Sequence, residues 1–293
     1  MNSFKRTLTA LGMTLALVAA PAWAQTNSSS VSQTGNGNSA VVEQEYITGG
    51  SGMNEALITQ INTGGATADG NTVFKLAQAG SGNLFDVYQE GTNNIVRSYP
   101  AQGTSSRPSY DGMIDIDQFG DGNEVWDADQ SEASNALTIV QEGDGNFVDF
   151  EAQVSTGAMG NMATITQLGS GNTVGQAGSG LGAYQEGDGN TMMITQNGDN
   201  NEAGTMVSPH LDGAKFDPEF KFGGPFPEGG QSIVQFGMDN TMTITQSGGD
   251  VVGYALQDGI GNTMTILQDG GDNYAGVSQV GNGNTAIIDQ TSY

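Results

Sequence analysis

The sequence contains no cysteine, only 7 prolines, 2 tryptophans and 1 histidine, and few basic residues. Without cysteine the chain cannot form disulfide bonds, so packing and hydrogen bonds must stabilise its fold. It carries 7 Lys and Arg residues against 32 Asp and Glu residues, a formal net charge of −25 at pH 7. Nucleic-acid binding needs a basic surface, so this composition argues against it. His210 has no second histidine or cysteine beside which it could complete a zinc site or a catalytic triad, and we expect no enzyme and no metal or other cofactor.

Long hydrophobic runs are also rare, and the one clear example lies at the N-terminus. Lys5 and Arg6 precede an apolar run that ends in Ala22-Trp23-Ala24. This order predicts a signal peptide over residues 1–24, with cleavage before Gln25. The apolar run is too short for a convincing membrane span. We therefore expect an exported mature protein of residues 25–293 that is not embedded in a membrane.

Glycine, asparagine and glutamine are abundant, and they recur at fixed spacings. The pattern Asn-x5-Gln occurs eleven times, and the pattern Gln-x-Gly-x-x-Asn occurs twelve times. The six residues "QEGDGN" occur unchanged at 141–146 and at 185–190. The two patterns interlock into a half-repeat of about eleven residues, which predicts a short strand followed by a turn.

Side chains alternate between the two faces of a strand, so Asn-x5-Gln places its first, third, fifth and seventh residues on one face. In "NTMMITQ", residues 190–196, that face carries Asn, Met, Ile and Gln, whereas the other carries Thr, Met and Thr. One strand–turn–strand unit cannot bury its apolar face, but stacked units can. The pattern predicts an all-β, two-sheet β-solenoid of about ten strand–turn–strand rungs, which resembles cross-β structures.

Stacking would place each inward amide above an equivalent amide, where both can form hydrogen bonds along the column. The residues expected in these amide ladders are Asn38, Gln44, Asn54, Gln60, Gln78, Asn83, Gln89, Gln118, Asn135, Gln141, Asn161, Gln167, Gln185, Asn190, Gln196, Gln235, Asn240, Gln246, Gln257, Asn262, Gln268, Asn273, Gln279, Asn284 and Gln290. The glycines expected to shape the turns are Gly35, Gly80, Gly120, Gly143, Gly169, Gly187, Gly237, Gly259 and Gly281.

The repeat has three kinds of irregularity. The strands beginning near Asn71, Asn123 and Asn146 have one extra residue before glutamine, which predicts a bulge in each. Residues 172–176 and 181–185 are interpreted as two shortened strands, each lacking two residues. Residues 100–111 and 208–229 interrupt the pattern and are expected to be insertions that project from one end of a rung.

The repeat and the leader together resemble the curlin-repeat family, whose repeat reads Ser/Asn-x5-Gln-x-Gly-x-x-Asn-x5-Gln behind a signal peptide. The resemblance covers most of residues 25–293 outside the two insertions. It implies a major or minor subunit of a curli-like functional-amyloid fibre, which polymerises at the cell surface for adhesion and biofilm matrix. It also implies self-association, a nucleator or second curlin-like subunit, and export through an outer-membrane channel with accessory factors.

The alternative is a monomeric secreted β-solenoid that binds calcium, ice or a glycan. Calcium would use the turn acids Asp121, Asp144, Asp188 and Asp199, although the calcium-binding β-roll has a different period, and solvated turn acids are the simpler interpretation. Soluble solenoids end in polar capping units. Here the pattern starts at Asn27 and continues to Gln290, which favours the polymer.

Overall fold

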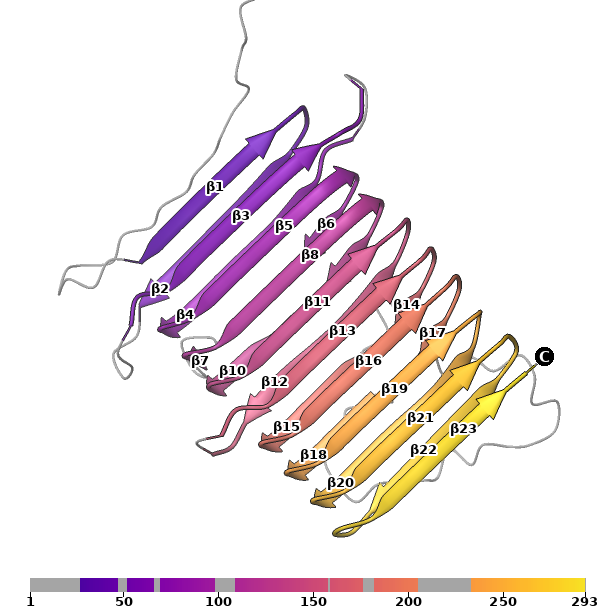
Figure 1. Cartoon of the computed structure of the whole chain (residues 1–293). Helices are drawn as coiled ribbons and strands as arrows, with labels where there is room; N and C mark the ends of the chain where they lie inside the picture. The colour runs from indigo at the N-terminus through magenta and orange to yellow at the C-terminus, as the bar shows by residue number, and fades with distance from the viewer. Residues whose placement is uncertain are drawn as a thin grey trace, which may run out of the picture.

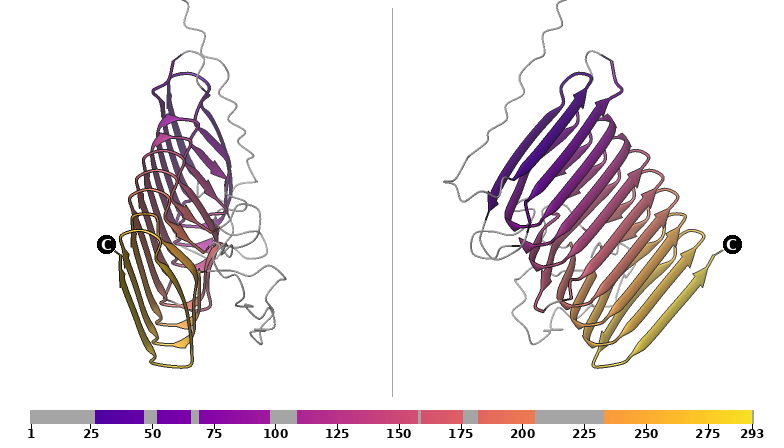
Figure 2. Two further views of the ribbon diagram at one scale, coloured as in Figure 1. Left: turned by 90° about the vertical axis from the view of Figure 1, so that its right-hand side faces the viewer. Right: turned by 60° about the vertical axis from the view of Figure 1, so that its left-hand side comes forward.

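The computed structural model describes residues 27–46, 52–65, 69–97, 109–157, 159–175, 182–204 and 233–292. Every regular element in these ranges is a β-strand, and the strands form two parallel sheets that pack face to face (Figures 1 and 2). The chain passes from one sheet to the other and back, so consecutive strands of a sheet lie one rung apart. This arrangement confirms the predicted all-β, two-sheet β-solenoid. Among the described residues, no helix has the length and apolar character needed to cross a membrane.

The first sheet has ten strands, one for each expected rung, and they lie in chain order. The strands are β1 (Ser28–Thr34), β3 (Glu55–Asn62), β5 (Leu84–Thr92), β8 (Met113–Asp121), β11 (Ala136–Glu142), β13 (Met162–Leu168), β16 (Thr191–Asn197), β19 (Thr241–Ser247), β21 (Thr263–Asp269) and β23 (Thr285–Thr291). All neighbours are parallel and their glutamines are in register, so the repeat spacing of the sequence becomes a spatial column.

The second sheet has thirteen strands, but four of its positions are each filled by two short strands, so it has nine positions. The strands are β2 (Ser39–Tyr46), β4 (Thr72–Ser81), β6 (Ile95–Arg97) with β7 (Ser109–Tyr110), β9 (Glu124–Trp126) with β10 (Gln130–Ala133), β12 (Phe147–Ser155), β14 (Thr173–Val174) with β15 (Ala183–Asp188), β17 (Glu202–Ala203) with β18 (Ile233–Met238), β20 (Val251–Ile260) and β22 (Tyr274–Val280).

The split positions are recognised from their neighbours. The strand β20 pairs with β17 through Val251 and Val252, and it pairs with β18 over Ala255–Ile260. One continuous strand therefore lies beside two short ones that together fill a single position. The same holds for β12, which pairs with β14 at one end and with β15 at the other.

Three sequence interpretations are corrected by this topology. Residues 172–176 and 181–185 are not two shortened strands, because β14 and β15 fill one position of the second sheet. The first insertion ends before Ser109, which already pairs with Gly80. It leaves from the middle of a second-sheet position, between β6 and β7, and not from the end of a rung. The second insertion and the predicted signal peptide lie outside the described residues. The strands β17 and β18 flank residues 205–232, as β6 and β7 flank the first insertion.

The predicted bulges are confirmed in β4 and β12, where the pairing register shifts by one residue. Near Asn123 the extra residue instead accompanies a break between β9 and β10, where Asp127 has a positive φ of 52°. A further bulge, which was not predicted from the sequence, lies in β20.

The core lies between the sheets and consists of stacked aliphatic side chains from every rung. The first sheet contributes a column of fully buried residues, namely Ile58, Val87, Ile116, Ile139, Ile165, Ile194, Ile244 and Ile266. Opposite them lie smaller or aromatic residues such as Val148, Phe150 and Val252. Because each rung alone is only two strands wide, this core exists only when rungs are stacked.

Candidate functional site

A ladder of glutamine side chains runs along the whole first sheet. Each Nε2 group donates to the Oε1 atom of the next rung at 2.7–3.3 Å. The ladder consists of Gln33, Gln60, Gln89, Gln118, Gln141, Gln167, Gln196, Gln246, Gln268 and Gln290. All nine bonds have the same direction, from the N-terminal rung to the C-terminal rung.

A second glutamine ladder runs along the second sheet with the same direction. Gln44 donates to Gln78 at 2.7 Å. A further run joins Gln130, Gln153, Gln185, Gln235, Gln257 and Gln279 at 2.7–3.0 Å. Gln130 and Gln153 were not predicted from the sequence, because an extra residue before each removes the Asn-x5-Gln spacing and neither begins a Gln-x-Gly-x-x-Asn turn.

The glutamines also show that the two sheets are offset by half a rung. Gln60 Nε2, on the first sheet, donates to the carbonyls of Ser39 and Asn71, which begin two successive second-sheet strands. Gln78, on the second sheet, likewise donates to Glu55 and Asn83, at the starts of two successive first-sheet strands. Each strand thus lies level with the space between two strands of the opposite sheet, as in a continuous staircase.

The asparagines form two further columns at the starts of the strands. Each Oδ1 atom accepts the backbone N–H of the equivalent residue one rung on, and most Nδ2 groups donate to a turn carbonyl. Asn161 accepts from the backbone N–H of Asn190 at 3.1 Å, and its Nδ2 donates to the carbonyl of Gly187. The column before the first sheet contains Asn27, Asn54, Asn83, Asn135, Asn161, Asn190, Asn240, Asn262 and Asn284, with Gly112 in place of one asparagine.

The column before the second sheet contains Asn38, Asn71, Asn94, Asn123, Asn146, Asn172, Asn201, Asp250 and Asn273. Only Asn38 and Asn273 were expected in a ladder, because the other strands do not reach glutamine after five residues. For most of the other asparagines in this column, the sequence did contain a recognisable pattern. Five of the missed asparagines, namely Asn94, Asn123, Asn146, Asn172 and Asn201, end a Gln-x-Gly-x-x-Asn turn.

The expected turn glycines all have positive φ, a conformation that residues with a Cβ atom resist. Gly143 shows a second constraint, because a Cβ atom there would overlap the carbonyl oxygen of Gly169 on the next rung. Gly145, in the same turn, also has positive φ but has open space around it. The first glycine of the turn therefore lets neighbouring turns stack closely.

The turn acids take part in the stack as well. Asp121 Oδ1 accepts the backbone N–H of Thr92 at 2.8 Å, and Asp144 Oδ1 accepts that of Asp121 at 2.9 Å. Asp199 accepts from Ser170 at 2.7 Å. These carboxylates use one oxygen to join successive turns, so the interpretation of them as merely solvated is incomplete. Among the described residues, no group of three or more His, Asp or Glu side chains is arranged to hold a metal ion.

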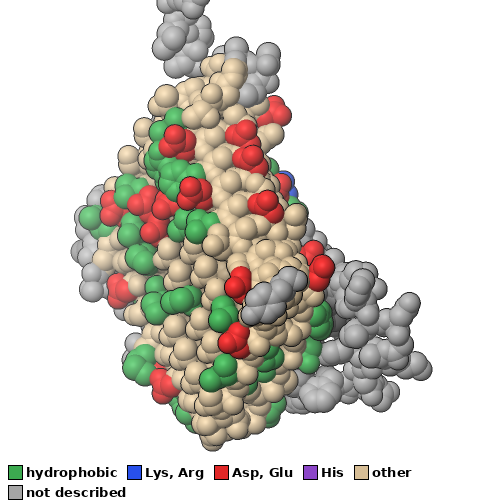
Figure 3. Space-filling model, turned by 45° about the vertical axis from the view of Figure 1, so that its right-hand side comes forward, with side chains coloured by type: hydrophobic (Ala, Val, Ile, Leu, Met, Phe, Trp, Pro, Cys, Tyr) green, Lys and Arg blue, Asp and Glu red, His purple; other side chains and the backbone are tan. Residues whose placement is uncertain are grey.

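The outer face of the first sheet carries an acidic group that the sequence analysis did not identify. Asp86 and Asp115 lie opposite each other on adjacent strands, and Asp117 lies two residues further along β8. Partial burial raises the pKa of all three carboxyls above the usual value. Repulsion from Asp115 and Glu55 raises the pKa of Asp86 further, and repulsion from Asp115 and Asp86 raises that of Asp117. Acidic side chains are scattered over the face of the molecule shown in Figure 3.

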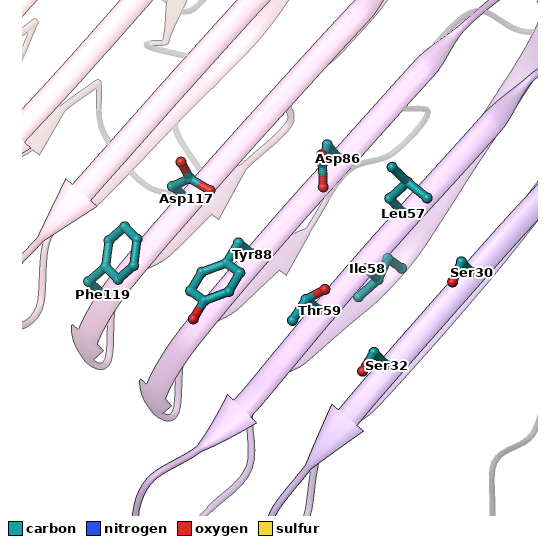
Figure 4. A pocket seen from close by; sticks show the side chains of 9 residues that line it. All are labelled: Ser30, Ser32, Leu57, Ile58, Thr59, Asp86, Tyr88, Asp117 and Phe119. Carbon is teal, nitrogen blue, oxygen red and sulfur yellow. The ribbon is translucent and has the colours of Figure 1, made fainter.

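Next to these acids lies a shallow groove, where small side chains of β1 and β3 meet two large rings. Tyr88 and Phe119 lie with their ring centroids 5.3 Å apart and their planes tilted by 39°, and Ser30, Ser32 and Thr59 line the same groove (Figure 4). The Tyr88 hydroxyl donates to Glu90, and this hydrogen bond raises the pKa of the tyrosine. The groove is open to solvent and combines rings with carboxyl groups.

The two ends of the solenoid are open. Within the described residues, β1 and β23 each pair with one strand, as do β2 and β22. At one end Gln33 exposes the Oε1 acceptor of its ladder. At the other end Gln290 Nε2 donates to the carbonyl of Tyr274, and it is the last glutamine of the ladder among the described residues. Ile287 on β23 is 71% exposed.

The comparisons with known proteins give one family. Residues 187–248 and 259–291 match the model of the curlin associated repeat. These residues contain the last rungs of the solenoid, including β16, β19, β21 and β23. No curated protein matches the sequence.

Proposed function

We propose that this chain, whose residues 187–248 and 259–291 carry the curlin associated repeat, is a structural subunit of an extracellular, curli-like amyloid fibre. The fibre grows when copies of the chain stack end to end at the cell surface. The observation that carries the proposal is the pair of end faces of the described solenoid, at which β1, β2, β22 and β23 each keep one strand edge without a partner among the residues that the structure describes. Open strand edges are templates for pairing with another chain.

The ladders make the two end faces complementary. All glutamine-to-glutamine hydrogen bonds among the described residues run in one direction, so one face offers Nε2 donors and the other offers Oε1 acceptors. Stacking two donor faces would leave buried amides without partners, at a cost of roughly 1–3 kcal/mol for each group. Head-to-tail addition avoids this cost, and it explains why the fibre would have a direction.

The wider role follows from the resemblance and from the predicted signal peptide. We propose that the mature chain leaves the cell through an outer-membrane channel with accessory factors and meets a nucleator or second curlin-like subunit outside. Its fibres then contribute to adhesion and biofilm matrix. The high negative charge helps to keep the exported chain soluble before it assembles.

The test is the assembly of purified residues 25–293. Incubation at micromolar concentration should give fibres in negative-stain electron microscopy, with a reflection near 4.7–4.8 Å along the fibre axis. A protein that stays a folded monomer for days would contradict the proposal and would favour the ligand-binding alternative.

A further inference from the structure

The two end faces of the solenoid do not match strand for strand. Within the described residues the first sheet has ten positions and the second has nine, and both end strands, β1 and β23, belong to the first sheet. Because the sheets are offset by half a rung, the position that follows β23 in the staircase belongs to the second sheet. A copy added by simple translation places its β1 on β23, and one second-sheet position remains empty at every junction.

We infer that successive copies of a protein consisting of residues 25–293 alternate, each rotated by about half a turn about the fibre axis relative to the last. This inference rests on the proposed function. In this arrangement β1 of the incoming copy pairs with β22, and its β2 pairs with β23. The first sheet of one copy then continues the second sheet of its neighbour, and no position stays empty.

The geometry of the rungs permits this exchange. Strands of the two sheets run in opposite directions across a rung, so half a turn about the axis makes an incoming β1 parallel to β22. The inward faces also correspond. Gln279 and Val277 of β22 would face Gln33 and Val31 of the incoming copy, and the glutamine ladder would continue in the same direction.

The spacing of the end strands supports the same conclusion. First-sheet strands generally have five residues between the column asparagine and glutamine. In the second sheet only the two end strands, Asn38–Gln44 and Asn273–Gln279, have this spacing. The seven positions between them have an extra residue or are split. Thus second-sheet strands have the Asn-to-Gln spacing of the first sheet only at the two ends, where the alternating arrangement pairs strands of the two sheets.

The edge of β22 that faces away from β20 makes the two arrangements differ in free energy. Inside the solenoid a strand in this position forms a parallel ladder on both sides, and seven residues of β22 pair with β20 across the bulge in β20. Translation would leave its other edge and the end of the second glutamine ladder unpaired inside the fibre. Alternation pairs both, so it satisfies backbone groups that a buried edge would otherwise leave without partners.

Cysteine crosslinking distinguishes the two arrangements, because the chain has no cysteine of its own. Ser32 of an incoming copy would lie beside Ser278 if copies alternate, and beside Asp289 if they are translated. All three side chains are exposed. Neighbouring parallel strands are about 4.8 Å apart, which suits a disulfide. Within one copy these residues lie at opposite ends, so a disulfide can form only between copies.

The double variants S32C/S278C and S32C/D289C are assembled under reducing conditions, oxidised and run on a non-reducing gel. We expect S32C/S278C to give a ladder of covalent multimers that dithiothreitol collapses, and S32C/D289C to stay monomeric. Multimers of S32C/D289C, or fibres in which neither pair crosslinks, would overturn the alternating arrangement while the fibre function stands. Failure of the cysteine-free protein to form fibres would instead overturn the proposed function.

Electron-microscopic reconstruction of the unmodified fibre gives an independent measurement if either variant fails to assemble. Alternation predicts a rotation near half a turn and an axial rise of about 46 Å per copy, from nine and a half rungs of about 4.8 Å. Translation predicts almost no rotation and a rise of about 48 Å per copy. A fibre of the second kind would overturn the inference.

Discussion

Asp250 is the only acidic residue in the two asparagine columns described above. Its Oδ1 atom accepts from the backbone and side chain of Asn273, as the Oδ1 atoms of the asparagines do. Its Oδ2 atom takes the place of an amide donor and is buried without a hydrogen-bond partner. Elsewhere in the column the amide donates to a turn carbonyl, as Asn172 Nδ2 does to Gly198 at 2.8 Å. The Asp250 Oδ2 atom, which stands where an asparagine has Nδ2, thus weakens the asparagine column at this position.

Replacing Asp250 by asparagine should stabilise the protein. The new Nδ2 group can donate where Oδ2 has no partner, and removing an unsatisfied buried polar group is worth about 1–3 kcal/mol. The measurement is the guanidinium concentration at which fibres dissolve. Asn201→Asp is the matched control and should lower that concentration, since it creates the same defect one rung away. An unchanged midpoint for Asp250→Asn would show that Oδ2 is already satisfied in solution.

At the scale of the element, interruptions of the second sheet all fall at one place in the strand. The chain departs after Gly175 in one split position and after Gly204 in another, between the two inward apolar residues. Joining Gly204 to Ile233 would give "NEAGIVQ", a regular Asn-x5-Gln strand. The residues on the two sides of the interruption therefore make up one complete half-repeat. Pairing with β20 holds these two parts in register.

Deleting residues 205–232 should leave fibre formation intact and slightly stabilise the solenoid. The deletion joins β17 and β18 into one strand with the spacing of β22, and it removes the entropy cost of closing a long loop. Electron microscopy and the dissolution midpoint are the measurements. As a control, deleting residues 192–195 from the complete strand β16 should abolish assembly. If removal of 205–232 abolishes it too, the segment belongs to the fibre core.

For the whole molecule, the dominant long-range force is repulsion between acids. The formal charge of −25 is distributed along a stack whose rungs are about 4.8 Å apart, closer than the Debye length of about 8 Å at physiological ionic strength. Asp86 is distant in sequence from Asp115 and Asp117 but lies opposite Asp115 on the sheet. Burial raises the pKa values of all three, and neighbouring carboxylates raise those of Asp86 and Asp117 further. A carboxyl with a raised pKa in the folded state stabilises that state most below its unfolded pKa.

Assembly should therefore accelerate as pH falls from 7.5 toward 4.5. The stabilising contribution of these three acids is complete below the ordinary aspartate pKa of 3.8 and is lost as pH rises through their raised values. The lag time of thioflavin fluorescence should shorten severalfold at pH 4.5. The triple variant D86N/D115N/D117N should have a shorter lag at pH 7.5 and a weaker response to pH.

The control for this variant neutralises three acids that are not adjacent, as D239N/D258N/D289N. It makes the same change in net charge, so it should retain most of the pH response. Equal responses of the two triple variants would show that total charge, and not the acidic group on β5 and β8, governs assembly. A lag that lengthens at low pH would contradict the repulsion argument altogether.

The sequence by itself determined the rung, because its information is local. The alternation of side chains within "NTMMITQ" identifies the buried face, and the following glycines identify the turn, so the two-sheet solenoid and the glutamines of the first sheet could be predicted. Tertiary structure decided what depends on pairing between rungs. Neither the membership of Asn172 and Gln185 in a single split strand nor the proximity of Asp86 to Asp115 follows from local spacing. Pairing register tolerates bulges and insertions, so only the assembled ladders show which distant residues share a column.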